Sequence, residues 1–153
     1  MILEYHMLRD PGYHPQRANP SDAGLDLRWN PTEVAESALS IGPGESVLIP
    51  TGCAFAIPHG YMMEIKNKSG IAYKRQLLVG ACVVDSGYEG EVFVNLHNVG
   101  HVTQWLSPGD KVAQGVVVPV VHARFRATSR PSLYGYPITI SDRGEGALGS
   151  TGE

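Results

Sequence analysis

The stretch ACVVDSGYEGEV at residues 81–92 decides our prediction of both the fold and the chemistry. Its two apolar arms flank Asp85-Ser86-Gly87, a sequence typical of a tight turn, so we predict a β-hairpin here. The turn would hold the Asp85 carboxylate close to the Tyr88 ring. That carboxylate could deprotonate a water, and the ring could pack on a sugar or a base. Alternatively, Asp85 satisfies amides of the turn and Tyr88 covers the edge of the sheet.

The composition favours an all-β domain built from short strands. The chain has 153 residues, of which 42% are hydrophobic, enough for the core of one ordinary domain. Its 18 glycines and 11 prolines suit many turns better than a helical bundle. No internal repeat or linker divides the sequence. We therefore predict a single domain over residues 1–153.

The charge and the apolar pattern of the sequence argue against nucleic acid and membranes as partners. A net charge of −3 and a pI near 6.0 provide no broad basic surface, so we expect no binding to nucleic acid. The sequence has neither a leader pattern nor an apolar run of membrane-spanning length. Cys53 and Cys82 form no paired motif, which suits a reducing compartment. We expect an intracellular, cytoplasmic protein without membrane contact.

Apolar periodicity predicts strands and one short helix. Residues 67–75 are the best candidate for the helix, with Ser69 as its N-terminal cap. The first amides of that helix and the charge of Lys68 could hold an anion, although an ordinary capped helix is equally compatible. Strands are predicted at residues 1–8, 25–27, 47–49, 53–57, 61–66, 92–96 and 116–125.

Two polar residues stand out within predicted strands. Asp26 alternates with Leu25 and Leu27, so its side chain should point away from the core, toward solvent or a metal ion. Gln114 lies between apolar neighbours and needs a partner, either a structural hydrogen bond or a ligand.

The C-terminal residues 143–152 differ from the rest of the chain. They have too few apolar residues for a strand and too many glycines for a helix, so they form a flexible tail or an arm that a ligand orders. Their spacing imitates a Walker phosphate loop, but Ser150 stands in the lysine position and no helix follows, which excludes that loop. Exposed amides, the hydroxyls of Ser150 and Thr151, and Arg143 would still suit a phosphate chain.

Five segments, residues 21–27, 68–72, 81–92, 109–114 and 143–152, resemble in sequence, order and spacing the five motifs of the trimeric deoxyuridine triphosphatases (dUTPases). The resemblance covers nearly the whole chain. It implies a small jelly roll of the β-clip type with one short helix. It also implies a homotrimer in which three subunits build each active site, with the arm at about residues 142–153 closing over a neighbouring subunit's site.

The resemblance further implies a substrate, dUTP, and Mg²⁺ as cofactor. Asp85 matches the aspartate that contacts the sugar 3′-hydroxyl and activates the attacking water. Tyr88 matches the tyrosine that packs against deoxyribose and leaves no room for a 2′-hydroxyl. Asp26 matches the acid that holds Mg²⁺ through water, and Gln114 matches a glutamine near the α-phosphate.

The remaining matches concern the phosphates and the base. Phosphate contacts at the helix start match Lys68, Ser69 and Gly70, and uracil is read largely by main-chain atoms of the hairpin, at Ala81, Cys82 and Val84. The arm that grips the γ-phosphate end matches Arg143, Gly149, Ser150 and Thr151, and Leu148 stands where a residue covers the uracil ring.

Several positions depart from the commonest pattern of the family. Lysine replaces arginine at Lys68 and Lys111, and Leu148 replaces a phenylalanine. Cys82 replaces a glycine and would be strained if its φ were positive. Three functions remain open: a Mg²⁺-dependent dUTP pyrophosphatase, a dCTP deaminase of the same superfamily, and a catalytically weakened nucleotide-binding or regulatory protein.

Overall fold

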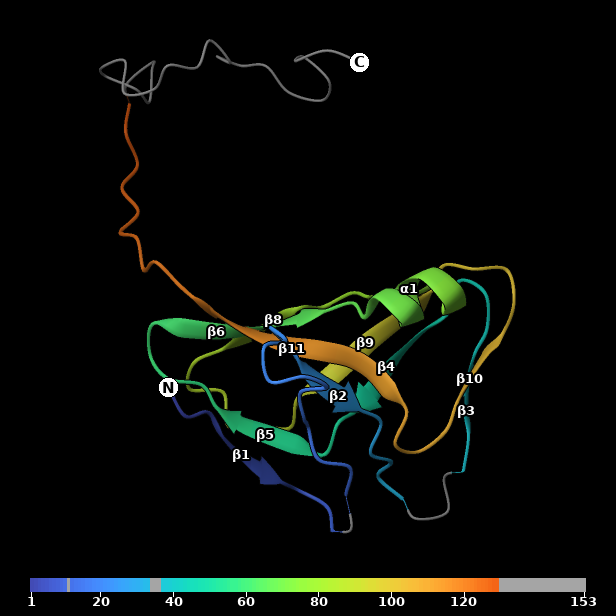
Figure 1. The fold of residues 1–153 in the computed structure, drawn as a ribbon. Coiled ribbons are helices and arrows are strands. Elements are labelled where there is room, and N and C mark those ends of the chain that lie inside the picture. The colour runs from blue at the N-terminus through green and yellow to red at the C-terminus, as the bar shows by residue number, and fades with distance from the viewer. Residues whose placement is uncertain (11, 34–36, 130–153) are drawn as a thin grey trace. The chain divides into compact units, whose positions relative to one another are not determined.

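The computed structural model describes residues 1–10, 12–33 and 37–129, and this part of the chain forms short strands and one helix (Figure 1). The all-β prediction is confirmed. The strands are β1 (Glu4–Met7), β2 (Leu25–Arg28), β3 (Leu39–Ile41), β4 (Ser46–Pro50), β5 (Cys53–Ala56), β6 (Tyr61–Lys66), β7 (Leu77–Val79), β8 (Val83–Asp85), β9 (Phe93–Asn98), β10 (Gln104–Leu106) and β11 (Lys111–Pro119), and the helix is α1 (Ser69–Arg75).

The strands pair antiparallel in four small sheets. The largest has the order β2-β11-β6-β8, and the second has the order β4-β9-β7. Two-stranded sheets are formed by β1 with β5 and by β3 with β10. Apolar residues from all four sheets meet in one core, which includes Leu27, Trp29, Ile41, Ile49, Phe55, Met63, Ile65, Leu96, Leu106 and Val112.

The alternation predicted around residues 92–96 is confirmed. Val92, Val94 and Leu96 are buried, whereas Phe93 is 43% exposed. The strand assigned there, β9, pairs with β4 on one side and with β7 on the other. One face of β9 therefore belongs to the core.

The predicted strand at residues 116–125 is too long. β11 ends at Pro119, whose pairing partner Tyr61 is the first residue of β6. Beyond that point β6 offers no further partner, and the backbone of Pro119 itself has no N–H to donate. Val121 is 90% exposed and Phe125 is 98% exposed.

The predicted hairpin at residues 81–92 is correct in its turn and wrong in its pairing. The N–H of Tyr88 donates to the carbonyl of Asp85 at 3.3 Å, and Gly87 has φ of 85°. The two arms do not pair with each other, because β8 pairs with β6 while Val92 leads into the other sheet. Turn chemistry is local, whereas the partner of each arm depends on which side of the core buries it.

The predicted helix is present, but Ser69 does not cap it. Ser69 is the first helical residue, and the cap position belongs to Lys68, which has extended backbone and no capping side-chain bond. A capping side chain must come from the residue that precedes the first helical one. Gln76, with φ of 53°, ends the helix in the left-handed conformation.

Contacts divide the chain into a unit Met1–His122 and a unit Ala123–Glu153. In the second unit, the described residues 123–129 are exposed and contain no helix or strand. The arm predicted at residues 142–153 lies outside the described residues. No helix in the described part of the chain is long and apolar enough to cross a membrane.

Candidate active site

The outer face of the four-stranded sheet presents both aspartates singled out in the sequence. Residues directly opposite in an antiparallel pair share a face. Asp26 pairs with Gln114, and Gln114 pairs with Lys66. Met62, four residues before Lys66 and on the same face, pairs with Asp85. The two aspartates therefore lie on one face of the sheet, opposite the side chains that enter the core.

Asp26 lies between two lysines on this face. Its side chain points away from the core as predicted, but it is only 3% exposed. Its Oδ1 accepts a hydrogen bond from Lys68, and the Nζ of Lys111 lies 2.6 Å from Oδ2. Of the two environments left open by the sequence, free solvent is excluded for Asp26 by these contacts.

A β-bulge brings Lys111 to Asp26. The register between β11 and β2 shifts between Lys111 and Ala113, so that Lys111 lies opposite Arg28 and Ala113 lies opposite Leu27. The bulge adds one residue to β11 between Lys111 and Ala113. Without it, Lys111 would share the face of the buried Ala113. The bulge therefore moves one positive charge from the core side of the sheet to the side of Asp26.

The electrostatics of Asp26 result from opposing effects. Burial acts to raise the pKa of this carboxyl, because the charged form loses hydration. The contacts with Lys111 and Lys68 act in the other direction and prevail, so the pKa lies below its ordinary value of 3.8. Asp26 is therefore ionised at neutral pH.

Gln114 joins this group through a structural hydrogen bond. Its Nε2 donates to the carbonyl of Asn67 at 2.9 Å, which ties β11 to the segment just before α1. Its Oε1 packs on Gly24, where an added Cβ would lie only 2.3 Å from that oxygen. Gly24 is thus required by close packing and not by its own φ.

Ser69 and Gly70 follow Lys68 directly and are both exposed at the start of α1. The first turn of the helix contains no acidic residue, and an added Cβ on Gly70 would meet no atom within 4 Å. The amides of this turn are therefore open to an anion beside Lys68.

Asp85 and Tyr88 line a different feature, a pocket of about 490 Å³. Both side chains are exposed, as the turn predicted. Ala81 and Val84 line the same pocket. Pocket residues that the sequence interpretation missed come from distant strands or from beyond the turn: Leu48, Glu91, Phe93 and Asn95.

One signal for the missed residues exists in the sequence. Phe93 and Asn95 alternate with the buried Val94, which places them on the outward face of β9. Leu48 is 65% exposed beside the fully buried Ile49. One exposed apolar side chain is ordinary, whereas a patch of them is typical of a binding surface, and only the fold gathers Leu48 and Phe93 beside Asp85.

Cys82 is not among the residues that line the pocket. Its carbonyl accepts a hydrogen bond from the N–H of Ile65 at 2.7 Å. Among the described residues, Gln76 is the only non-glycine with positive φ, so Cys82 is unstrained. Replacement of the glycine common at this position is therefore tolerated by the backbone.

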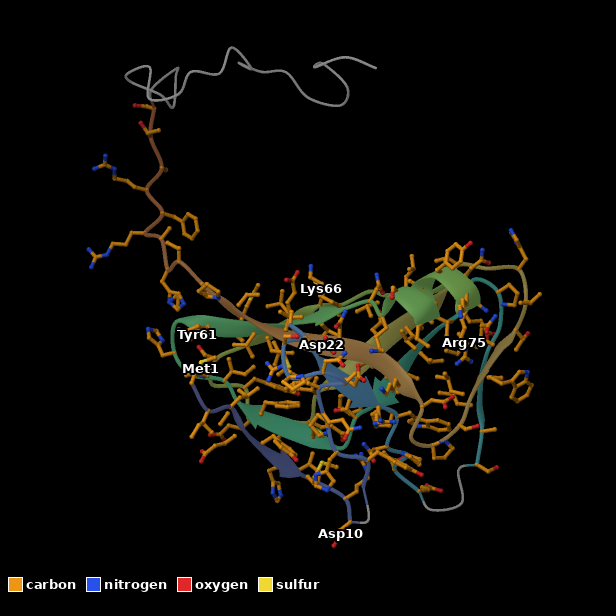
Figure 2. All side chains as sticks on the ribbon, in the orientation of Figure 1. Met1, Asp10, Asp22, Tyr61, Lys66 and Arg75 are labelled. Carbon is orange, nitrogen blue, oxygen red and sulfur yellow. The ribbon has the colours of Figure 1, made fainter. Side chains whose placement is uncertain are left out.

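We call Asp26, Lys68, Lys111 and Gln114 the Asp26 group. Within one chain, this group lies apart from the Asp85 pocket. Three strand spacings separate β2 from β8, and four residues of β6 separate Lys66 from Met62. On an ideal sheet this corresponds to roughly 19 Å between the two aspartates. Figure 2 labels Tyr61 and Lys66, the first and last residues of β6. The predicted arm residues Arg143, Leu148, Gly149, Ser150 and Thr151 lie outside the described part of the chain.

Two relatives with similar sequences have the same name. A relative in Laribacter hongkongensis, named deoxyuridine 5′-triphosphate nucleotidohydrolase, is 41% identical over 141 residues, which are 90% of this chain and 87% of the relative. A relative of the same name in Burkholderia cenocepacia is 38% identical over 154 residues, covering 99% of this chain and 95% of the relative.

Two solved structures with a similar fold are dUTPases of staphylococcal phages. A dUTPase of Staphylococcus bacteriophage 80alpha with bound dUpNHpp matches with a TM-score of 0.83 and 22% identity over 99% of each chain. The dUTPase of phage phi11 of S. aureus, described as coordinating a structural Mg(II) ion, matches with a TM-score of 0.75 and 23% identity over 85% of this chain and 98% of that one. At these identities the structures show that the fold is shared. The sequence model of the dUTPase family matches residues 10–152, and together with the relatives this shows that the chain belongs to the dUTPase family.

Proposed function

We propose that the protein hydrolyses dUTP to dUMP and pyrophosphate by water attack on the α-phosphorus, in active sites shared between the subunits of a homotrimer. The observation that supports this most directly is the division of the outer sheet face. Two lysines that suit a phosphate chain surround Asp26, while an acid and an aromatic ring, Asp85 and Tyr88, line the pocket at the other end of the face. Neither group alone contains both the proposed base and the proposed phosphate contacts.

Asp85 is the proposed catalytic residue. It contacts the sugar 3′-hydroxyl and takes a proton from the attacking water, which requires hydrogen-bond reach of that water. Its position in an open pocket beside Tyr88 supports this role. Tyr88 packs against deoxyribose. Main-chain atoms of Ala81, Cys82 and Val84 read the uracil, with the Cys82 carbonyl left to its bond with Ile65. Phosphoryl transfer needs positioning and charge stabilisation more than a covalent nucleophile.

The phosphates would bind at the start of α1. Lys68 supplies positive charge there, Ser69 and Gly70 supply main-chain amides, and Gln114 lies near the α-phosphate. In the absence of a nucleotide, Asp26 neutralises Lys68. A triphosphate that approaches this turn would compete with Asp26 for the ammonium group, while Lys111 continues to balance Asp26.

The donor set is compatible with Mg²⁺ held through water. The described residues contain no cluster of three or more His, Cys, Asp or Glu side chains that could enclose a metal ion. Magnesium in nucleotide sites is held by few carboxylates and by the phosphates themselves. Asp26 is ionised, and its Oδ1 would be free to accept from a metal-bound water once Lys68 turns to the phosphates, while the buried Oδ2 keeps its contact with Lys111. When bound, Mg²⁺ would neutralise part of the triphosphate charge.

The homotrimer is supported by the separation of the two groups. A general base acts within one water of its target, so an Asp85 roughly 19 Å from the Asp26 group cannot serve phosphates held by the same chain. A second subunit would supply the missing half. The arm with Arg143, Leu148, Gly149, Ser150 and Thr151 would close over the site from a third subunit and exclude water.

The cysteines support an intracellular location. Both Cys53 and Cys82 are free thiols. Burial raises the pKa of Cys53 to about 11, which keeps this thiol protonated and inert. We propose that the protein acts in a reducing compartment, the cytoplasm.

Asp85→Asn tests the proposed function. With Mg²⁺ present, the wild-type protein should release pyrophosphate from dUTP, and Asp85→Asn should lower kcat by about 100-fold or more, the usual contribution of a general base. Calorimetry with dUpNHpp should show that nucleotide binding persists in the variant. Equal turnover by Asp85→Asn would remove Asp85 from the proposed role.

Two further measurements distinguish the alternatives. A dCTP deaminase would release ammonia from dCTP, and a nucleotide-binding regulatory protein would bind dUTP tightly without turnover. The relatives named above are nucleotidohydrolases, which favours hydrolysis over deamination.

A further inference from the structure

A two-pronged ion pair joins Arg9 to Glu91. Arg9 lies outside the five motif segments, and Glu91 lies near the end of the segment at residues 81–92. The Nη1 and Nη2 atoms of Arg9 lie 2.8 and 2.7 Å from the two carboxylate oxygens of Glu91. The Arg9 and Glu91 side chains are only 22% and 13% exposed. A planar guanidinium matched to a carboxylate in this way fixes orientation as well as distance.

The pair belongs to a junction of three chain segments. The N–H of Gly52 donates to Glu91 Oε1 at 2.8 Å, so this carboxylate has donors from two sides. Next to Arg9, the N–H of Leu8 donates to the carbonyl of Gly52 at 2.7 Å. Next to Glu91, the hydroxyl of the buried Thr51 donates to the carbonyl of Val92 at 2.5 Å. The backbone of Glu91 is therefore held in place by residues far from it in sequence.

Glu91 in turn holds Tyr88. The Tyr88 hydroxyl donates to the main-chain carbonyl of Glu91 at 3.0 Å. The ring lies over Gly90, where an added Cβ would be 2.5 Å from the hydroxyl oxygen. Because Tyr88 is 47% exposed, no surrounding core fixes this ring. The hydrogen bond to Glu91 and the contact with Gly90 determine its orientation.

The Tyr88 ring lines two separate hollows of the surface. On one side the ring lines the pocket of about 490 Å³ that contains Asp85. On the other side it lines an apolar hollow of about 600 Å³ together with Tyr5 and Phe55. If the Glu91 carbonyl moved, the ring could turn toward that hollow and leave room in the Asp85 pocket.

We propose that Arg9 and Glu91 are positioning residues that hold Tyr88 against the sugar and thereby set the discrimination of deoxyribose from ribose, an inference that rests on the function proposed above. Arg9 does not line the Asp85 pocket, and Glu91, which does, acts on Tyr88 through its main-chain carbonyl. Loss of the ion pair frees the Glu91 backbone, and Tyr88 then no longer closes the space that a 2′-hydroxyl would occupy.

Arg9→Met removes both guanidinium donors and keeps an apolar stem of similar length. The ratio of kcat/KM for dUTP to that for UTP should fall roughly two- to tenfold, the effect expected from loss of one neutral hydrogen bond at Tyr88. Glu91→Gln, which keeps the side-chain volume and an acceptor for Gly52, is the milder variant and should lower the ratio in the same direction. A ratio unchanged in both variants would overturn the proposal.

A double-variant cycle shows whether Arg9 acts through Tyr88. Tyr88→Phe removes the hydroxyl that bonds to Glu91 and should itself lower the dUTP-to-UTP ratio. In that background, Arg9→Met should cause no further loss, because the hydroxyl it positions is already absent. Two independent, multiplicative losses would show that Arg9 acts by another route.

Ile41→Val provides the matched control for stability. Ile41 is fully buried in β3, so the variant lowers stability without touching the junction. It should reduce Tm while leaving the dUTP-to-UTP ratio unchanged. A fall in the ratio for Ile41→Val as large as for Arg9→Met would reduce the role of Arg9 to stability alone.

Fluorine NMR distinguishes failure of this inference from failure of the proposed function. In protein labelled with 3-fluorotyrosine, the Tyr88 resonance is assigned by its absence in Tyr88→Phe. Arg9→Met should shift or broaden that resonance even if the wild-type protein hydrolyses no dUTP, in which case only the proposed function is lost. An unchanged Tyr88 resonance would contradict the positioning role whatever the activity.

Discussion

At the scale of single residues, Asp26 determines the charge balance of the candidate phosphate site. One carboxylate at 3% exposure meets two ammonium groups, from Lys68 before α1 and from Lys111 at the start of β11. The Nζ of Lys111 lies 2.6 Å from the buried Oδ2, so each carboxylate oxygen has an ammonium partner. A lysine is a point charge on a mobile stem, and two of them can share one carboxylate without the fixed geometry that arginines would impose.

We expect the pairing of Asp26 to appear in the pH dependence of stability. The folded pKa of Asp26 lies below its unfolded value of 3.8, so its contribution is fully present above that value. The contribution is lost as pH falls through the lowered pKa. Urea unfolding at pH 7 should show Asp26→Asn to be less stable than wild type by roughly 1–3 kcal/mol, since the variant leaves two ammonium groups without their carboxylate.

The difference in unfolding free energy between the two proteins should remain constant from pH 7 to about pH 5 and shrink below pH 3.8, the unfolded pKa. Asp22→Asn, at a partly exposed aspartate that bonds only to its own loop, is the control. A difference that grew as the pH fell would contradict the lowered pKa of Asp26.

At the scale of elements, the segment from Cys82 through the turn at Gly87 shows which backbone positions require glycine. Gly87 has φ of 85° and needs this freedom, whereas Cys82 does not have positive φ. The turn is closed by the bond from the Tyr88 N–H to the Asp85 carbonyl. The backbone that leads into β8 therefore accepts a side chain at residue 82 without strain.

Paired substitutions in this segment should change stability for different reasons. Cys82→Gly restores the residue common in the family, yet it should lower the free energy of unfolding by roughly 0.5–1 kcal/mol, because glycine adds freedom to the unfolded chain and relieves no strain. Gly87→Ala should cost roughly 1–2 kcal/mol, because alanine is disfavoured at positive φ. Thermal unfolding of both variants provides the measurement, and a gain of stability in Cys82→Gly would indicate strain at Cys82.

At the scale of the whole molecule, the spacing between the Asp26 group and the Asp85 pocket decides how a complete site can form. Both lie on the outer face of one sheet, at opposite ends of β6 and with two strands between β2 and β8. No movement of side chains closes a gap of that size. A symmetric trimer repeats both groups and can bring the Asp26 group of one subunit to the Asp85 pocket of another.

Mixing two inactive variants tests this arrangement. Asp85→Asn and Asp26→Asn should each have little activity as pure trimers. When the two are unfolded together, refolded at equal amounts and assayed, activity should return to about a quarter of the wild-type value, since each of two positions in a site is filled by the competent subunit half of the time. Mixing the folded trimers without subunit exchange is the control. Absence of recovery in properly mixed trimers would place both aspartates in the same chain's site.

The sequence alone was sufficient for those features that depend on short stretches of chain. The Asp85–Tyr88 turn, the alternation around Val94 and the outward direction of Asp26 follow from turn chemistry and from the period of side chains along a strand. The short helix was also predicted, although its capping residue was not. The order of five short motifs was enough to indicate the family.

Only the tertiary structure decided which distant residues meet. That β8 pairs with β6 and not with the other arm of its turn, that β11 stops at Pro119, and that a bulge brings Lys111 to Asp26 depend on the pairing partner each strand finds. The junction of Arg9 with Glu91 spans 82 positions of sequence. Such contacts leave no local pattern, because their free energy comes from burial and charge pairing between segments that the chain brings together only on folding.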